Sequence, residues 1–90
     1  MTSAARQFEI LNQRGLHARA AAKFVRIASA FEATINVCHG GTEVCGTSIM
    51  GLMMLAASKG TVISVRAVGD AAEAAVEALS MLVRNRFDEG

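Results

Sequence analysis

The stretch between residues 34 and 45 limits the fold of this chain more than any other. Apolar and polar residues alternate over Thr34–His39 and again over Thr42–Cys45, which predicts two strands, each with one buried face. The Gly40-Gly41 pair between them is typical of a two-residue hairpin turn. An antiparallel hairpin is therefore expected here.

A two-residue turn also sets the register of this hairpin. Val37 is expected opposite Val44, and Cys38 opposite Glu43. The residues expected on the core face are Ile35, Val37 and Val44, and those on the other face are Asn36, Cys38, Glu43 and Cys45. Because the second set is mostly polar, a sheet with one face open to water follows.

Two more segments alternate in the same way. They are Arg6–Leu11, with Phe8 and Ile10 inward, and Thr61–Val68, with Ile63, Val65 and Ala67 inward. Together with the hairpin they predict a four-stranded, mainly antiparallel sheet.

Three segments predict helices, and the element order predicts an α+β fold with the helices on one face of the sheet. The first runs from Ala18 to about Ala30 and carries its apolar residues at helical spacing. A short apolar helix follows, capped by Thr47 or Ser48 and stopped by Lys59-Gly60. The last spans 71 to about 86, with Gly69-Asp70 as the turn and N-cap signal.

Composition narrows the class of protein. Ninety residues, 52% hydrophobic and 19% charged, suit one small domain, of which residues 1–5 are expected to be poorly ordered. The net charge of +1 and the lack of a basic stripe argue against nucleic acid. No apolar run has the length of a signal peptide or membrane span, so a cytoplasmic protein is expected. Cys38 and Cys45 lack the spacing of a metal site, and free thiols are expected.

His17 is an unusual residue at the start of a helix. Ser, Thr, Asp or Asn would cap the first N–H groups better, and the positive end of the helix disfavours an imidazolium. A neutral imidazole there keeps one ring nitrogen free as a nucleophile. The unpaired amides at Ala18 and Arg19, with the forked guanidinium of Arg19, suit a phosphoryl group. The alternative is that His17 is an ordinary surface histidine.

Two separated motifs resemble one known family. G-L-H-A-R-A-A-A-K-F-V, from Gly15, and T-S-I-M-G-L-M-M-L, from Thr47, are similar to the HPr phosphocarriers of the bacterial phosphoenolpyruvate-dependent phosphotransferase system. The similarity covers nearly the whole chain. It implies an open-faced β-sandwich in which His17 is phosphorylated on its δ nitrogen (the pros position) and Arg19 is the active-site arginine. No cofactor or metal is implied.

The resemblance also implies partners and regulation. Enzyme I would donate the phosphoryl group, and an enzyme IIA domain would take it. Ser48 matches a serine that HPr kinase/phosphorylase modifies in many members; a plain helix cap is the alternative. Ala20 stands where many members have proline, which leaves the branch of the family open.

The short helix predicts a docking surface beside His17. It has more large apolar residues than so short a helix can bury, and Ile49, Met50 and Met53 are expected to be exposed. Transient partners explain such a patch, so a monomer is expected.

Two alternatives to a sugar-transport phosphocarrier remain. The chain also looks like the nitrogen-related (NPr-type) branch, whose carriers feed a regulatory enzyme IIA. A different class would be a module that binds regulators through the Met-rich patch while His17 stays idle; the presence of both His17 and Arg19 counts against it.

Overall fold

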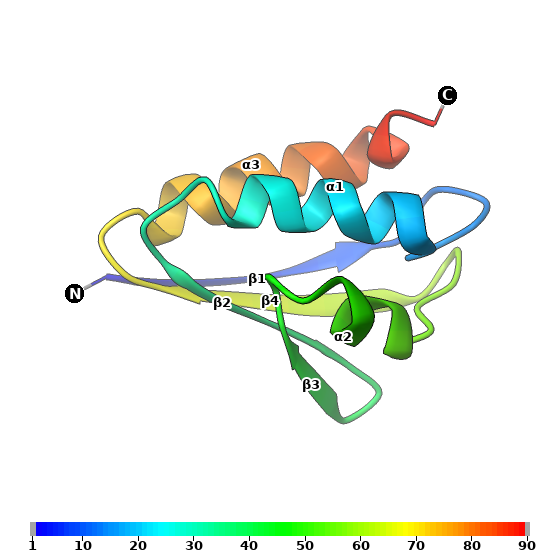
Figure 1. The fold of residues 1–90 in the computed structure, drawn as a ribbon, viewed down its shortest axis with the longest axis horizontal. Helices are drawn as coiled ribbons and strands as arrows, with labels where there is room; N and C mark the ends of the chain where they lie inside the picture. The colour runs from blue at the N-terminus through cyan, green and yellow to red at the C-terminus, as the bar shows by residue number, and fades with distance from the viewer. Residues whose placement is uncertain (1, 90) are drawn as a thin grey trace.

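In the computed structural model, which describes residues 2–89, four strands form one antiparallel sheet (Figure 1). The strands are β1 (Ser3–Glu9), β2 (Thr34–His39), β3 (Thr42–Cys45) and β4 (Val62–Val68). Their order across the sheet is β1-β4-β2-β3. The predicted antiparallel sheet is confirmed.

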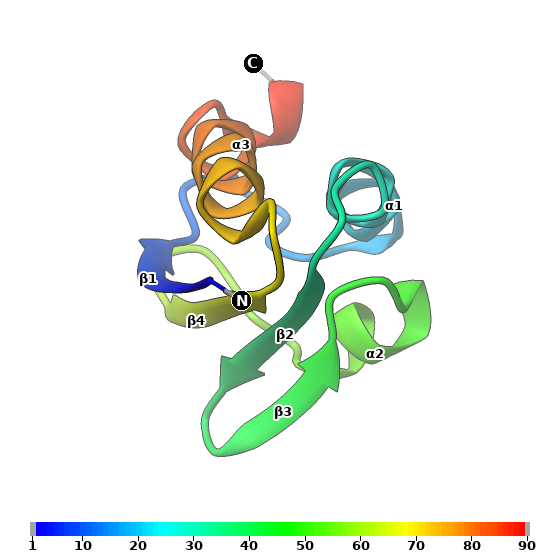
Figure 2. The same cartoon turned by 90° about the vertical axis from the view of Figure 1, so that its left-hand side faces the viewer.

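The helices leave one face of this sheet open. They are α1 (Ala18–Ala28), α2 (Ile49–Met54) and α3 (Ala72–Arg84), followed by the short turn η1 (Arg86–Asp88). Figure 2 shows α1 and α3 side by side above the sheet, with α2 beside the β2–β3 hairpin. The expected open-faced α+β sandwich is therefore confirmed.

The hairpin has the predicted register. Val37 pairs with Val44 and Cys38 with Glu43. Ile35 and Val37 are buried, and Val44 packs against the core. Both cysteines carry free thiols, with Cys45 exposed.

The core lies between the sheet and the two long helices. It takes Phe8 and Ile10 from the first strand region and Ile63, Val65 and Ala67 from β4, as the alternation predicts. From α3 it takes one apolar stripe at helical spacing, which consists of Ala72, Ala75, Val76, Leu79, Leu82 and Val83. Burial of this stripe holds α3 over β1 and β4.

The first strand begins earlier than predicted. β1 starts at Ser3 rather than Arg6, so the strand includes Ser3–Ala5 of the segment expected to be poorly ordered; Met1 lies outside the described residues. The reason is the length of β4, whose Val68 pairs with Ser3. Local sequence shows no inward apolar pattern there, because the pairing rather than burial orders these residues.

All three helices end before the predicted residue, and one is not capped as predicted. α1 ends at Ala28 rather than at about Ala30. α2 stops at Met54, well before Lys59-Gly60, and Ala56 adopts a left-handed φ of 54°. This turn lets Ala57 accept a hydrogen bond that stabilises the loop before α1. The N-cap of α3 is Ala71 rather than Asp70, without a side-chain bond, and α3 ends at Arg84.

No helix within residues 2–89 combines the length and the apolar character needed to cross a membrane. The described residues also contain no group of three or more His, Cys, Asp or Glu side chains that could hold a metal ion.

Candidate functional site

His17 occupies the N-cap position of α1. Its backbone is extended, with φ −73° and ψ 177°, and its carbonyl accepts the first helical bond from the Ala21 N–H at 2.8 Å. Its side chain makes no capping bond and is 16% exposed. The ring is thus held at the mouth of the helix and remains accessible to solvent, as the sequence predicts.

The loop before α1 fixes where His17 stands. Gly15 has a left-handed φ of +63°, and its backbone lies so close to Ala57 that a Cβ would be 2.3 Å from that carbonyl oxygen. The Leu16 N–H donates to the same carbonyl at 3.0 Å, and the Leu16 side chain is buried. The loop is therefore anchored on the segment after α2, just before the histidine.

The first turn of α1 presents free backbone donors. Because the first bond within the helix comes from Ala21, the amides of Ala18–Ala20 have no acceptor inside it. Its first turn contains no acidic side chain. Ala20 contributes its N–H to the set, whereas a proline at this position would have none. The arrangement suits an anion.

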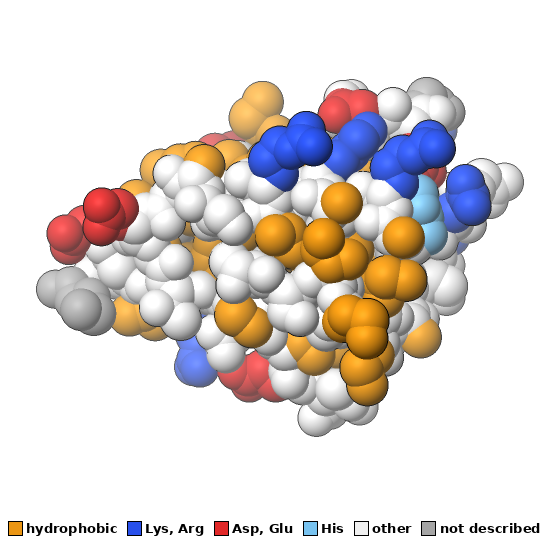
Figure 3. Space-filling model, in the orientation of Figure 1, with side chains coloured by type: hydrophobic (Ala, Val, Ile, Leu, Met, Phe, Trp, Pro, Cys, Tyr) orange, Lys and Arg blue, Asp and Glu red, His pale blue; other side chains and the backbone are white. Residues whose placement is uncertain are grey.

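Basic side chains surround His17. Together with His17 they line a hollow of about 440 Å³, and Arg19 is one of them, as predicted. Its charged residues are five basic ones, Arg14, Arg19, Lys23, Lys59 and Arg86, and two acidic ones, Asp88 and Glu89. The hollow therefore carries a formal charge of +3, against +1 for the whole chain. Figure 3 shows basic side chains gathered over α1.

The end of the chain contributes a carboxylate to this site. One oxygen of Glu89 makes a close hydrogen bond with Nε2 of His17, and the other accepts from the Asn12 side-chain amide at 3.2 Å. The His17 bond is the largest cause of a lowered pKa for Glu89, and Asn12 and the charge of Arg14 act in the same direction. Glu89 is therefore ionised at neutral pH.

Glu89 is the residue of this hollow, in direct contact with His17, that the sequence did not predict. It lies 72 residues from His17 in the chain, and no spacing rule connects them. The one available signal is Phe87, a large apolar residue just beyond the last helix, which is fully buried and ties the tail to the body. A buried aromatic there indicates that the following residues are held against the protein.

Ser48 caps α2, as predicted. Its Oγ accepts a hydrogen bond from the Gly51 N–H at 3.0 Å, and its backbone is extended. The side chain is half-buried, and the helix that it caps packs against α1.

The apolar residues of α2 divide as expected. Leu52 and Leu55 are buried, whereas Ile49 and Met53 are each 41% exposed and Met50 is 73% exposed. Met54, at 76%, extends the exposed set. In Figure 3 apolar side chains over α2 lie directly below the basic ones over α1. Such a mixed surface is typical of a docking site.

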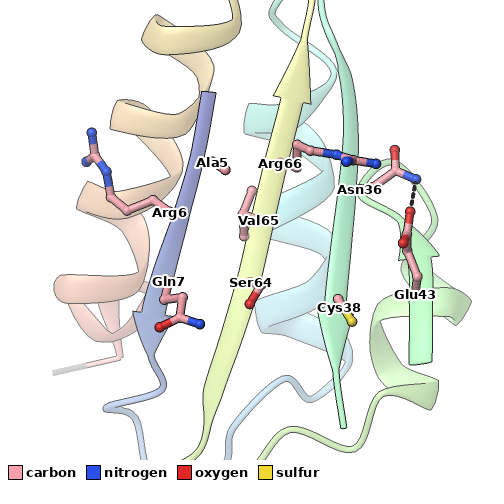
Figure 4. A pocket seen from close by; sticks show the side chains of 9 residues that line it. All are labelled: Ala5, Arg6, Gln7, Asn36, Cys38, Glu43, Ser64, Val65 and Arg66. Carbon is pink, nitrogen blue, oxygen red and sulfur yellow. Dashed lines mark hydrogen bonds between the residues drawn. The ribbon is translucent and has the colours of Figure 1, made fainter. Parts of the chain in front are cut away.

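A second hollow, of about 570 Å³, lies on the open face of the sheet (Figure 4). Arg66 extends across β2 toward Asn36, whose amide donates to Glu43 at 2.7 Å. The lining contains neither a histidine nor a pair of acidic residues. Cys38 is also part of the lining, but no helix N-terminus within residues 2–89 faces it as one faces His17.

Comparisons with known proteins agree with this geometry. The family model described as "PTS HPr component phosphorylation site" matches residues 4–85. The phosphocarrier protein HPr of Xylella fastidiosa (strain Temecula1) is 48% identical over 83 residues, which cover 92% of this chain and 93% of that protein. The phosphocarrier protein NPr of Shewanella violacea is 42% identical over 89 residues, which cover 99% and 98%.

Solved structures of HPr proteins are also similar to this chain. A crystal structure of an HPr from Thermoanaerobacter tengcongensis (HPr-C-His) superposes with a TM-score of 0.89 at 42% identity, covering 100% of this chain and 99% of that one. The HPr of Bacillus anthracis gives 0.87 at 37% identity, covering 92% and 99%. On its fold, its matched residues and its relatives, this chain belongs to the HPr family of the phosphotransferase system (PTS).

Proposed function

We propose that this protein is a phosphocarrier, which accepts a phosphoryl group from phospho-enzyme I on Nδ1 of His17 and passes it to an enzyme IIA domain. The observation that carries the proposal is a half-buried imidazole at an uncapped helix N-terminus, inside a basic hollow. We place the protein in the cytoplasm, as a monomer.

The transfer itself needs only the lone pair of Nδ1. That pair attacks phosphorus, a P–N bond forms, and the bond between phosphorus and the donor breaks, with the donor keeping the electron pair. The ring retains its proton on Nε2 and becomes positively charged. In the second step the acceptor attacks phosphorus, and the electron pair of the P–N bond returns to Nδ1.

The groups around His17 favour reversible binding of the phosphoryl group. A helix end stabilises an anion by about 0.3–1 kcal/mol when exposed. The Ala18–Ala20 amides and Arg19 suit the phosphoryl oxygens, so the bound group is held without being locked in place. A carrier needs this balance, because it must both receive and release.

Incubation with phosphoenolpyruvate and enzyme I tests the proposal. We expect the protein to gain one phosphate that is acid-labile and base-stable, the behaviour of a phosphohistidine. A folded sample that stays unlabelled would contradict the proposal and favour an interaction module that uses only its apolar patch.

Arg19 is expected to speed the transfer. Arg19→Ala removes a cation from the phosphoryl cradle and should slow phosphorylation by enzyme I about tenfold, with the fold intact because the side chain is exposed. Arg66→Ala, which removes an arginine from the open face, is the matched control and should leave the rate unchanged. Equal rates for the two variants would remove Arg19 from the mechanism.

Ser48 is proposed as a regulatory phosphorylation site. A phosphate there adds about −2 charge beside exposed Ile49 and Met50, which should weaken partner docking. HPr kinase/phosphorylase with ATP should give an acid-stable phosphate on the wild type and none on Ser48→Ala. Loss of the cap in that variant should also lower the free energy of unfolding by about 1 kcal/mol. Labelling that persists in the variant would rule out this site.

The similarity to an NPr favours a second candidate within the family. In that case the acceptor is a regulatory enzyme IIA rather than one that serves a sugar permease. The docking residues Ile49, Met50 and Met53 would serve either partner. Pull-down of the phosphorylated protein against both classes of enzyme IIA separates the two.

A further inference from the structure

We propose that Glu89 is a positioning residue, whose carboxylate holds the proton of His17 on Nε2 and leaves Nδ1 as the nucleophile. The inference deepens the function proposed above and rests on it. Residue 89 lies beyond the residues that the family model matches, which end at 85.

The chemistry of the contact sets the direction of the hydrogen bond. An ionised carboxylate has no proton and can only accept, so Nε2 of His17 must be the donor. With the proton on Nε2, the lone pair of a neutral ring is on Nδ1. Nδ1 has no hydrogen-bond partner among residues 2–89, so that pair is available.

The second oxygen of Glu89 is also fixed. The Asn12 amide nitrogen donates both to this oxygen, at 3.2 Å, and to the Gly15 carbonyl at 2.8 Å. Because both partners are acceptors, the nitrogen rather than the oxygen of Asn12 faces them. Asn12 is buried and thus connects the loop before α1 to the carboxylate that contacts the ring.

The conformation of residues 86–88 places Glu89 beside His17. Arg86, Phe87 and Asp88 all have left-handed φ values, of 55°, 53° and 63°, which non-glycine residues adopt at a cost. Burial of the Phe87 ring offsets the cost, and its carbonyl accepts from Nζ of Lys23 at 2.8 Å. The unfavourable turn persists because it is anchored on α1, directly before Glu89.

The carboxylate also favours the phosphorylated state. When Nδ1 gains the phosphoryl group the ring becomes cationic, and the Nε2–H bond to Glu89 becomes a bond between opposite charges. Fixing the proton and stabilising the charge both act through His17, without contact between Glu89 and the phosphorus.

The first test observes the ring directly by ¹⁵N and ¹H NMR of the intact protein. In the wild type, at a pH high enough for the His17 ring to be neutral, we expect a proton on Nε2 that exchanges slowly with water. Glu89→Ala should lose this protected proton, and Glu89→Gln, which keeps an acceptor oxygen, should retain part of the protection. Glu73→Gln removes a carboxylate at the far end of α3 and should match the wild type.

The second test measures the rate of phosphorylation by enzyme I. Glu89→Ala should slow it about three- to tenfold, Glu89→Gln less, and Glu73→Gln not at all. The contact is overturned if the wild type shows no protected Nε2 proton, or if Glu89→Ala protects that proton as well as the wild type does. A lost proton with an unchanged rate overturns its role in transfer. If the wild type itself is not phosphorylated, the proposed function is overturned instead. The NMR result does not depend on that function.

Discussion

Replacing His17 by alanine is expected to abolish phosphorylation by enzyme I. In the proposed transfer the imidazole is the nucleophile, and neither the helix amides nor Arg19 can form the bond to phosphorus. The fold should survive, because the His17 side chain makes no capping bond to α1 and only its backbone carbonyl contributes to the helix. Labelling with phosphoenolpyruvate and enzyme I, alongside circular dichroism, measures both effects.

His39 offers the matched control. It is the other histidine of the chain and lies at the end of β2, where its ring contacts the Val62 carbonyl at 3.2 Å. His39→Ala should be labelled as fast as the wild type. Equal labelling of His17→Ala would show that the phosphate is carried elsewhere.

Gly15→Ala is expected to give a large loss of stability. A Cβ at this position would be 2.3 Å from the Ala57 carbonyl oxygen, a backbone atom that cannot rotate away. The left-handed φ, the forced shift and the weakened bond from Leu16 together should lower the free energy of unfolding by about 3 kcal/mol. Urea unfolding measures this loss, and slower phosphorylation should accompany it because His17 follows two residues later.

Gly40→Ala separates the cost of the left-handed φ from the cost of the close approach to Ala57. Gly40 has a similar φ of +58°, but nothing lies within 4 Å of the added Cβ. It should therefore lose only the conformational part, about 1 kcal/mol. Equal losses for the two variants would mean that the close approach to Ala57 does not limit the fold.

Local pattern was enough to predict much of the architecture. The alternation around Gly40-Gly41 fixes both the register and the open face, because a two-residue turn permits one pairing. The position of His17 also followed from sequence, since the helix-forming residues begin directly after it.

The remaining features depend on contacts between distant segments. The end of α2 at Met54 is set by the bond between Leu16 and Ala57, which no local propensity encodes. The start of β1 at Ser3 depends on how far β4 extends. Glu89 reaches His17 only because Phe87 is buried against the body of the protein.

The central claim is that Nδ1 of His17 carries the phosphoryl group, and NMR of the ¹⁵N-labelled phosphorylated protein tests it most directly. The account predicts a one-bond coupling between ³¹P and Nδ1, with the proton remaining on Nε2 beside Glu89. A coupling to Nε2, or to no nitrogen of His17, would contradict it.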